Sequence, residues 1–166
     1  MAATFNWYQY NGANTAETSL GTGGNLVNFS AIDTAGTVGY DTNPITAGNQ
    51  SMSVYLKGKW GGTFNKIENL QFWRSTDFSP NTGLSLYWKA NGTTAYAAPS
   101  TATSVAADAV ATSDPGAENV YIGGATGGSL TAAGGSDYIV LQLRTTTAAA
   151  AGDTSLAEFT IQYDES

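Results

Sequence analysis

Short runs of apolar and aromatic residues recur along this 166-residue chain, separated by Gly, Asn, Pro and Ser. Within the runs, apolar side chains alternate with polar ones, and sustained helical periodicity is scarce. A period of two is typical of half-buried β-strands, and clusters of Gly and Pro mark the turns between them. The pattern predicts about eight strands, at residues 4–10, 25–30, 51–60, 66–75, 84–89, 119–122, 137–145 and 156–163.

Eight antiparallel strands with long connections favour an all-β fold: an antiparallel β-sandwich of jelly-roll type, with other sandwich topologies next. A length of 166 residues fits one domain, residues 1–166, which buries roughly 70% of its unfolded surface without disulfides or metals. Residues 97–111 are rich in Ala but are interrupted by Ser, Thr and Pro99. We interpret them as a loop or arm that allows one short helical turn.

The last two predicted strands are joined by a loop of small residues, 148–154. In the first of them Ile139, Leu141 and Leu143 share one side, and the second alternates in the same manner. We therefore predict that these two strands pair antiparallel and help to close the sandwich. Truncation after about Leu156 is then expected to unfold the domain.

Alternation in three other strands separates a core face from an outward face. The core candidates are Met52, Val54, Leu56 and Trp60, then Leu70 and Phe72, then Leu84, Leu86 and Trp88. If the three strands are neighbours, the opposite side carries an aromatic cluster rimmed by cations, as interfaces and sugar platforms do. The predicted interface residues are Tyr55, Lys57, Lys59, Trp73, Tyr87 and Lys89. The alternative is that a loop covers this face, so that Trp73 and Tyr87 form a second small core.

The chain contains no His and no Cys, which removes the usual nucleophiles, proton shuttles and soft-metal ligands. Paired carboxylates remain as a catalytic device, but only Glu68 and Glu158 fall inside predicted strands, without a spacing that indicates a shared cleft. The Gly-rich segments 21–24 and 123–128 lack a P-loop Lys and are interpreted as turns. We therefore predict a protein that is not an enzyme, with no catalytic residues and no cofactor.

Carboxylates in loops are also candidate ligands for Ca²⁺, which binds oxygen and needs no His. The loop acids in question are Asp108, Asp114, Glu118, Asp137 and Asp153. No EF-hand-like run gives them a register, and Asp114-Pro115-Gly116 has the composition of a tight turn. No metal site is predicted.

The formal net charge of −7 disfavours a nucleic acid or an acidic membrane as a partner, since both attract clustered Lys and Arg. The charge is uneven, because residues 57–89 carry five bases and two acids and are locally +3. A locally basic strand face on an acidic protein is suited to docking against an acidic partner.

Residues 1–10 have neither the basic segment nor the apolar run of a signal peptide, and no stretch approaches the length of a membrane span. We expect a protein that is made and kept in the cytoplasm, although its Thr/Asn/Gly-rich composition is typical of extracellular β-proteins. A virion component, made in the host cytoplasm and later exposed, satisfies both expectations. The alternative is a fragment of a secreted protein that has lost its signal.

The pattern as a whole resembles the capsid-decoration and other accessory virion proteins of tailed bacteriophages. The resemblance rests on the start Met1-Ala-Ala-Thr, on Phe72-Trp73-Arg74-Ser75, on Ser113-Asp-Pro-Gly116 with Asn119-Val-Tyr-Ile122, and on the ending Phe159-Thr-Ile-Gln-Tyr-Asp164. It implies a capsid decoration or cement protein that docks on the major capsid protein or other virion proteins, forms a homo-oligomer such as a trimer, and carries no catalytic residues. A carbohydrate-binding module that uses Trp73, Tyr87 and Tyr55 as stacking platforms is the rival prediction. A phage tail or fibre component is a further alternative.

Overall fold

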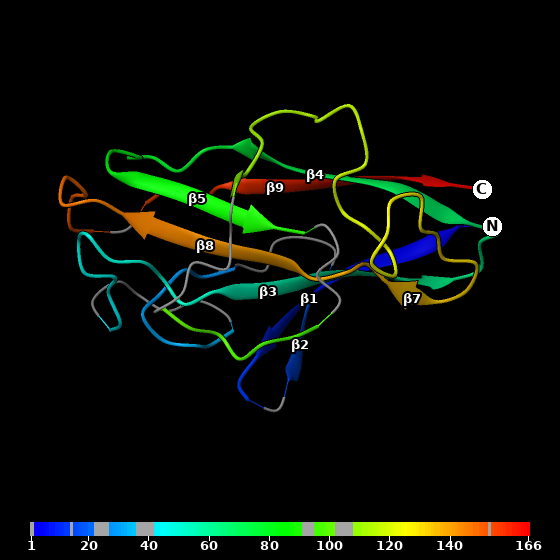
Figure 1. The fold of residues 1–166 in the computed structure, drawn as a ribbon, viewed down its shortest axis with the longest axis horizontal. Coiled ribbons are helices and arrows are strands. Elements are labelled where there is room, and N and C mark those ends of the chain that lie inside the picture. The colour runs from blue at the N-terminus through cyan, green and yellow to red at the C-terminus, as the bar shows by residue number, and fades with distance from the viewer. Residues whose placement is uncertain are drawn as a thin grey trace.

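The computed structural model describes residues 2–13, 15–21, 27–35, 42–90, 95–101, 108–152 and 154–166. These residues contain nine β-strands and no helix (Figure 1). In chain order the strands are β1 (Ala3–Asn11), β2 (Ala16–Gly21), β3 (Val54–Gly62), β4 (Ile67–Thr76), β5 (Leu84–Lys89), β6 (Asp108–Ala109), β7 (Gly134–Gly135), β8 (Ile139–Thr145) and β9 (Glu158–Glu165). The all-β prediction is confirmed.

The strands form two antiparallel sheets that pack against each other. The larger sheet has the order β2-β1-β3-β8-β5-β6, with β7 paired to β3, and the smaller sheet consists of β4 and β9. Buried residues of both sheets belong to one hydrophobic cluster, so the β-sandwich prediction is confirmed. The distribution of seven strands against two does not confirm a jelly-roll topology.

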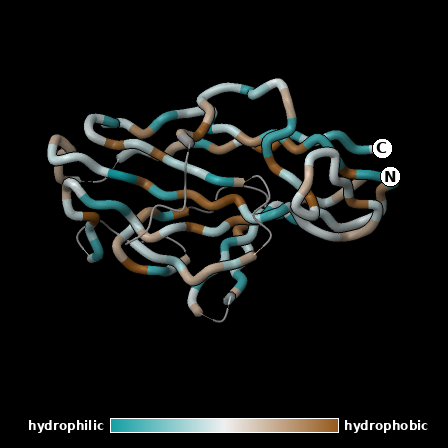
Figure 2. The backbone as a smooth tube through the Cα atoms, in the orientation of Figure 1, coloured by the Kyte–Doolittle hydropathy of each residue, from teal (hydrophilic) through white to brown (hydrophobic). Residues whose placement is uncertain are grey.

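Phe72 of β4 lies at the centre of the layer between the sheets. Its ring stacks on Phe159 at a centroid distance of 5.6 Å, and Trp88 and Trp7 of the larger sheet lie 5.5 Å and 6.0 Å away. The predicted core positions Val54, Leu56, Trp60, Leu70, Phe72 and Leu86 are buried, while Met52, Leu84 and Trp88 are half-buried. Figure 2 shows hydrophobic positions along the strands of both sheets.

Gly58 belongs to the same inner face, opposite Trp7 in the register of β3 with β1. A Cβ atom at this position would lie 2.9 Å from ring atoms of both Phe5 and Trp60. The missing side chain leaves the space that these two rings occupy, since buried side chains pack without spare volume.

A β-bulge in β4 explains why Ile67, Leu70 and Phe72 all face inward. The register with β9 shifts between Glu68 and Gln71, and Asn69 there has a φ of 56°, in the left-handed region that Asn tolerates better than most residues. The Asn69 side-chain amide donates a hydrogen bond to Asp164 of β9 at 3.0 Å. The extra residue therefore restores the inward direction of the following side chains.

The predicted pairing of the last two strands is wrong. Both edges of β8 are occupied, by β3 on one side and β5 on the other, so β9 crosses to the smaller sheet and pairs with β4. The connection of small residues after β8 thus bridges two sheets instead of forming a hairpin. The alternation in both segments was read correctly, but alternation does not specify the partner strand.

Two predicted strands are absent from the positions that the structure describes. Residues 27–30 are not a strand, and residues 25–26 of that prediction lie outside the described residues. Residues 119–122 run beside β4, where Asn119 and Val120 donate backbone hydrogen bonds to Leu70, and the Asn119 side chain bonds both backbone groups of Phe72. The Asn119 side-chain amide there makes the hydrogen bonds to β4 that the backbone of a paired strand would otherwise make.

Three strands were not predicted. β1 and β2 form a hairpin whose last cross-strand pair is Asn11 with Ala16, and Gly12 begins the connection with a φ of 71°. Asn-Gly at this place is a hairpin signal in the sequence. β2 itself is polar and mostly exposed, so no hydrophobic alternation marks it. β6 lies within the segment predicted as a loop or arm, of which residues 102–107 are outside the described residues, and β7 consists of two glycines.

Candidate functional site

The structure places five of the six predicted interface residues on one face and the sixth on another sheet. Tyr55, Lys57 and Lys59 of β3 and Tyr87 and Lys89 of β5 belong to the larger sheet, on the side away from the core, which we call the outer face. β3 and β5 are not adjacent, because β8 lies between them. Val140 of β8 is in register with both Tyr55 and Lys89, so one cross-strand row joins the two groups.

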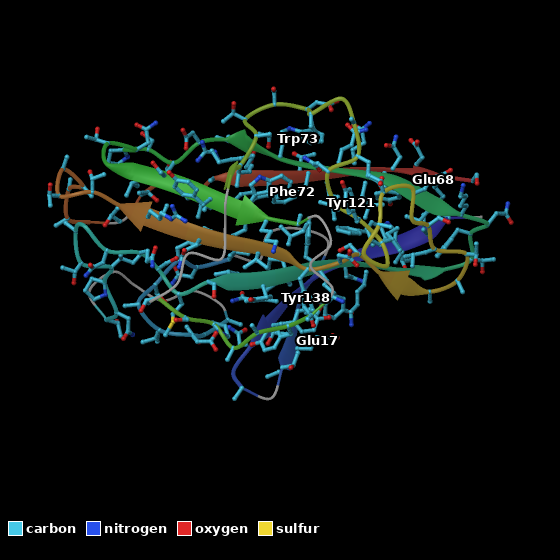
Figure 3. All side chains as sticks on the ribbon, viewed as in Figure 1. Glu17, Glu68, Phe72, Trp73, Tyr121 and Tyr138 are labelled. Atoms are coloured by element: carbon cyan, nitrogen blue, oxygen red, sulfur yellow. The ribbon has the colours of Figure 1, made fainter. Side chains whose placement is uncertain are left out.

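Trp73 does not belong to this face. It follows the core residue Phe72 on β4 and faces outward from the smaller sheet, opposite Thr160 of β9. Figure 3 shows it near the smaller sheet, away from Tyr138 and Glu17 of the outer face. The condition that the three strands are neighbours is therefore not met, since β8 separates β3 from β5 and β4 belongs to the other sheet.

Five tyrosines gather on the outer face, and we call them the tyrosine cluster: Tyr8, Tyr10, Tyr55, Tyr96 and Tyr138. Tyr138 contacts three of the others, with centroid distances of 5.1 Å to Tyr10, 5.6 Å to Tyr55 and 5.8 Å to Tyr96. Several of these pairs are edge-to-face, the arrangement that the ring quadrupole favours.

The tyrosine cluster is a second small core and not an open aromatic platform. Tyr10, Tyr55 and Tyr138 are only 5%, 4% and 7% exposed. Tyr96, from the segment 95–101, packs on Tyr55 at 4.9 Å and donates a hydrogen bond to the backbone oxygen of Gly12. A loop does cover part of this face, around Tyr55, as the alternative prediction had it. Trp73 and Tyr87 do not form the second core together, because they belong to different sheets.

A charged network borders the tyrosine cluster. The Tyr10 hydroxyl donates a 2.5 Å hydrogen bond to Glu17 Oε2, and the Lys59 ammonium group binds the same oxygen. These bonds, first from Lys59 and then from Tyr10, hold the pKa of Glu17 below its ordinary value. Burial, assisted by the same carboxylate, raises the pKa of Tyr10.

Lys57 contacts a ring of the tyrosine cluster. Its ammonium nitrogen lies 4.1 Å from the centroid of Tyr138, within the range of a cation–π interaction. Burial lowers the pKa of Lys57, since water is partly removed from around the charge. The Lys57 side chain thus sets its amine nitrogen against a tyrosine ring of the outer face.

The second cationic group on the outer face is built from β5 and β8. The Arg144 guanidinium lies 3.7 Å from the centroid of the half-buried Tyr87 ring. Lys89 is exposed at the end of the same strand as Tyr87. Aromatic rings and cations thus occur together at both ends of the row through Val140.

Part of the predicted positive charge is neutralised locally. Lys59 pairs with Glu17, Lys66 with Glu68, and Arg74 with Asp77. The ion pairs of Lys66 and Arg74 lie on the smaller sheet or directly beside it. Lys57, Lys89 and Arg144 lie on the outer face of the larger sheet, where Lys57 contacts Tyr138 and Arg144 contacts Tyr87.

The loop carboxylates have structural partners in the described part of the chain. Asp137 accepts hydrogen bonds from the backbone amides of Gly123 and Gly124, at 3.0 Å and 2.9 Å. Glu118 accepts one from Gly127, and Asp114 accepts one from Gly116, which confirms the turn predicted there. Among the described residues, no group of three or more His, Cys, Asp or Glu side chains could hold a metal ion.

Comparisons with known proteins stand beside this geometry. No protein-family model, curated protein or solved structure matches the chain. The described residues include no helix with the length and hydropathy that a membrane crossing requires.

Proposed function

We propose that this protein is a non-enzymatic structural component of a virion, of the capsid-decoration type, that docks on the particle through the outer face of its larger sheet. The observation that carries the proposal is the combination of Lys57, Lys89 and Arg144 with aromatic rings on one face of a chain whose net charge is −7. Aromatic residues and Arg are enriched at docking surfaces, and complementary charge favours an acidic partner and fixes the orientation.

The rigidity of the outer face supports this role. Tyr10 of β1, Tyr55 of β3 and Tyr138, which directly precedes β8, are buried, and the Tyr138 ring contacts the rings of the other two. A surface that is ordered before binding loses little conformational entropy when it docks. Mass action then stabilises the shell, because a protein that binds only the assembled particle shifts the equilibrium toward it.

The carbohydrate-binding alternative requires Tyr55, Tyr87 and Trp73 to form one exposed platform. Tyr55 is buried, and Trp73 belongs to the other sheet. The geometry therefore gives this alternative no shared stacking surface.

Immunogold electron microscopy tests the proposal. An antibody raised against the purified protein is applied to particles from the culture that produces the chain, with pre-immune serum as the control. We expect gold at regular positions on particle heads, and scattering from the purified protein that corresponds to a closed homo-oligomer such as a trimer. Label on tails only would support the tail or fibre alternative, and particles without label would contradict the proposal.

A further inference from the structure

One edge of the smaller sheet has no partner among the described residues. The edge of β4 that faces away from β9 is covered. The Arg74 backbone amide donates a hydrogen bond to the Ala111 carbonyl, and Ile67 and Leu130 exchange two backbone hydrogen bonds. The opposite edge of the sheet is β9, eight residues long, and its residues 159–164 have backbone partners only in β4. The edges of the larger sheet differ, since β2 is short and polar and β6 has two residues.

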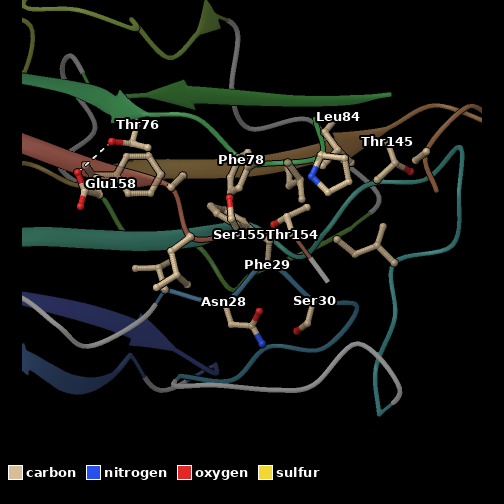
Figure 4. Close-up of a pocket in the computed structure, with 18 of the residues that line it drawn as sticks. Asn28, Phe29, Ser30, Thr76, Phe78, Leu84, Thr145, Thr154, Ser155 and Glu158 are labelled. Atoms are coloured by element: carbon tan, nitrogen blue, oxygen red, sulfur yellow. Dashed lines mark hydrogen bonds between the residues drawn. The ribbon is translucent and has the colours of Figure 1, made fainter. Parts of the chain in front are cut away.

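A cavity of about 940 Å³ lies between the two sheets and reaches the start of β9 (Figure 4). Its walls include inner-face residues of both sheets, namely Trp7, Leu20, Leu56, Phe72, Leu143 and Phe159. Residues 157–160 of the β9 end form one side, and residues 27–30 form another, with Phe29 packed on Phe78. Thr76 and Glu158 are hydrogen-bonded to each other in the wall.

The inner-face side chains of β9 show that this flank of the sandwich is incompletely covered. Phe159, Ile161 and Tyr163 pack on the core but are only half-buried, and so are Phe5 and Trp7 of β1. An unpaired strand edge next to half-buried apolar rings and a cavity is the arrangement left by a missing strand. The backbone of an added strand would form hydrogen bonds with β9, and every second side chain of that strand would point toward the cavity.

The sequence of β9 lacks two features that prevent edge strands from pairing with strands of other molecules. It contains neither Lys nor Pro, and its central residues 159–163 are uncharged. Its charged residues are all acidic: Glu158, Asp164 and Glu165. Antiparallel pairing of two copies of β9 would bring acidic ends together, which disfavours a second copy of this chain as the partner.

We infer that the free edge of β9 and the adjoining cavity bind an extended segment of a different protein, with apolar residues at alternate positions and Lys or Arg among the others. The apolar side chains enter the cavity, and the cations meet the acidic ends of β9. This inference goes beyond the proposed function and does not require the chain to sit on a virion. The cavity lies on the inner side of the larger sheet, so it is tested independently of the outer face.

A synthetic peptide tests the inference with the full chain. The probe is an end-capped octapeptide of sequence VKVTVKVT, and the control is the same peptide with its third valine replaced by proline, which cannot donate to a ladder. Binding is followed by calorimetry and by hydrogen exchange of the ¹⁵N-labelled protein. We expect VKVTVKVT to protect alternate backbone amides between residues 159 and 164, while the proline peptide protects none.

A pair of tryptophan variants locates the site. Ala157 lines the cavity, so Ala157→Trp is expected to fill it and to weaken peptide binding about tenfold or more. Ala117 is exposed, lies in the loop before residues 119–122 and does not line the cavity, so Ala117→Trp is expected to change the affinity by less than about twofold. Thermal unfolding of both variants establishes that each is folded before binding is compared.

Other occupants give different results, and each of these contradicts the inference. A small apolar ligand would be indicated if the uncharged dye N-phenyl-1-naphthylamine binds, Ala157→Trp abolishes that binding, and neither peptide protects β9. A second copy of the chain would be indicated by a dimer whose formation protects the β9 amides without peptide. Absence of peptide binding to the folded protein also overturns it, and none of these results bears on immunogold labelling.

Discussion

Tyr10 of β1 and Glu17 of β2 are joined by a 2.5 Å hydrogen bond from the phenol to the carboxylate. The same carboxylate oxygen also binds the Lys59 ammonium group of β3. One acidic residue on an otherwise polar edge strand thus connects three strands and borders the tyrosine cluster.

Replacement Glu17→Gln is expected to destabilise the protein by about 1 kcal/mol at neutral pH, since it weakens a hydrogen bond and removes a partly exposed ion pair. The pKa of Glu17 in the folded protein lies below its ordinary value of 4.5. Its contribution to stability is therefore complete well above pH 4.5 and is lost as the pH falls from there through the lowered folded-state pKa. Urea unfolding of both proteins at neutral pH and at about pH 3 checks this prediction. A difference between the proteins that does not shrink in acid would contradict it.

Alkaline pH is expected to destabilise the fold through the tyrosine cluster. Burial raises the pKa of Tyr96 to about 12, and it also raises the pKa values of Tyr10, Tyr55 and Tyr138 above 10.0. The unfolded chain therefore loses these protons first, and the free energy of unfolding falls as the pH rises above the ordinary tyrosine value.

Lys57 acts in the opposite direction and over a lower range. Its pKa is lowered from 10.5, so its effect is a rise in stability with pH between the lowered value and 10.5. Urea unfolding from about pH 8 to about pH 11, with phenolate absorbance recorded in parallel, separates the two effects. Tyr10→Phe should reduce the alkaline slope, and an unchanged slope would show that Tyr10 does not titrate as described.

Adjacent positions of β4 are expected to respond very differently to truncation. Phe72→Ala removes a ring that is fully buried among Trp7, Trp88 and Phe159, and should cost about 3–5 kcal/mol. Trp73→Ser, one residue further, should cost about 1 kcal/mol or less, because Trp73 faces outward. Denaturant unfolding of both variants measures the contrast, and similar losses would mean that Trp73 belongs to a core.

Asp137→Ala should cost about 2–4 kcal/mol, since it removes the acceptor of two backbone amides from a nearly buried site. Asp137→Asn retains one acceptor oxygen and should recover part of that loss. Thermal unfolding of the two variants ranks them. Equal stabilities would contradict a role for the carboxylate in holding the turn at Gly123 and Gly124.

Strand alternation was readable from the sequence wherever one side faces the core. Leu84, Leu86 and Trp88 were assigned to the core and Tyr87 to the opposite side, and β5 has the predicted bounds. A β-sandwich could be predicted from such strands, because sheets with one apolar face bury it by packing against each other. Edge strands could not be found in this way, since β2 has a polar and exposed sequence and β7 has no side chains at all.

Strand partners are the part that the sequence did not specify. Trp73 was grouped with Tyr55 and Tyr87 because their strands are close in the chain, yet β4 joins β9 in the other sheet. The tyrosine cluster draws residues from β1, β3, the segment 95–101 and Tyr138 next to β8. No local pattern encodes such contacts, because they depend on which strands lie side by side.

Sedimentation with particle heads tests the central claim most directly. The double replacement Tyr87→Ser with Lys89→Glu changes the outer face, and Trp73→Ser changes the outward side of the smaller sheet as a matched aromatic control. After both variants are shown to melt cooperatively, each is mixed with heads that lack the protein, and the fraction that sediments is measured. The account predicts that the double variant loses most of its binding while Trp73→Ser sediments like the unchanged protein. Loss of binding by Trp73→Ser alone, or binding unaffected by either change, would contradict docking through the outer face.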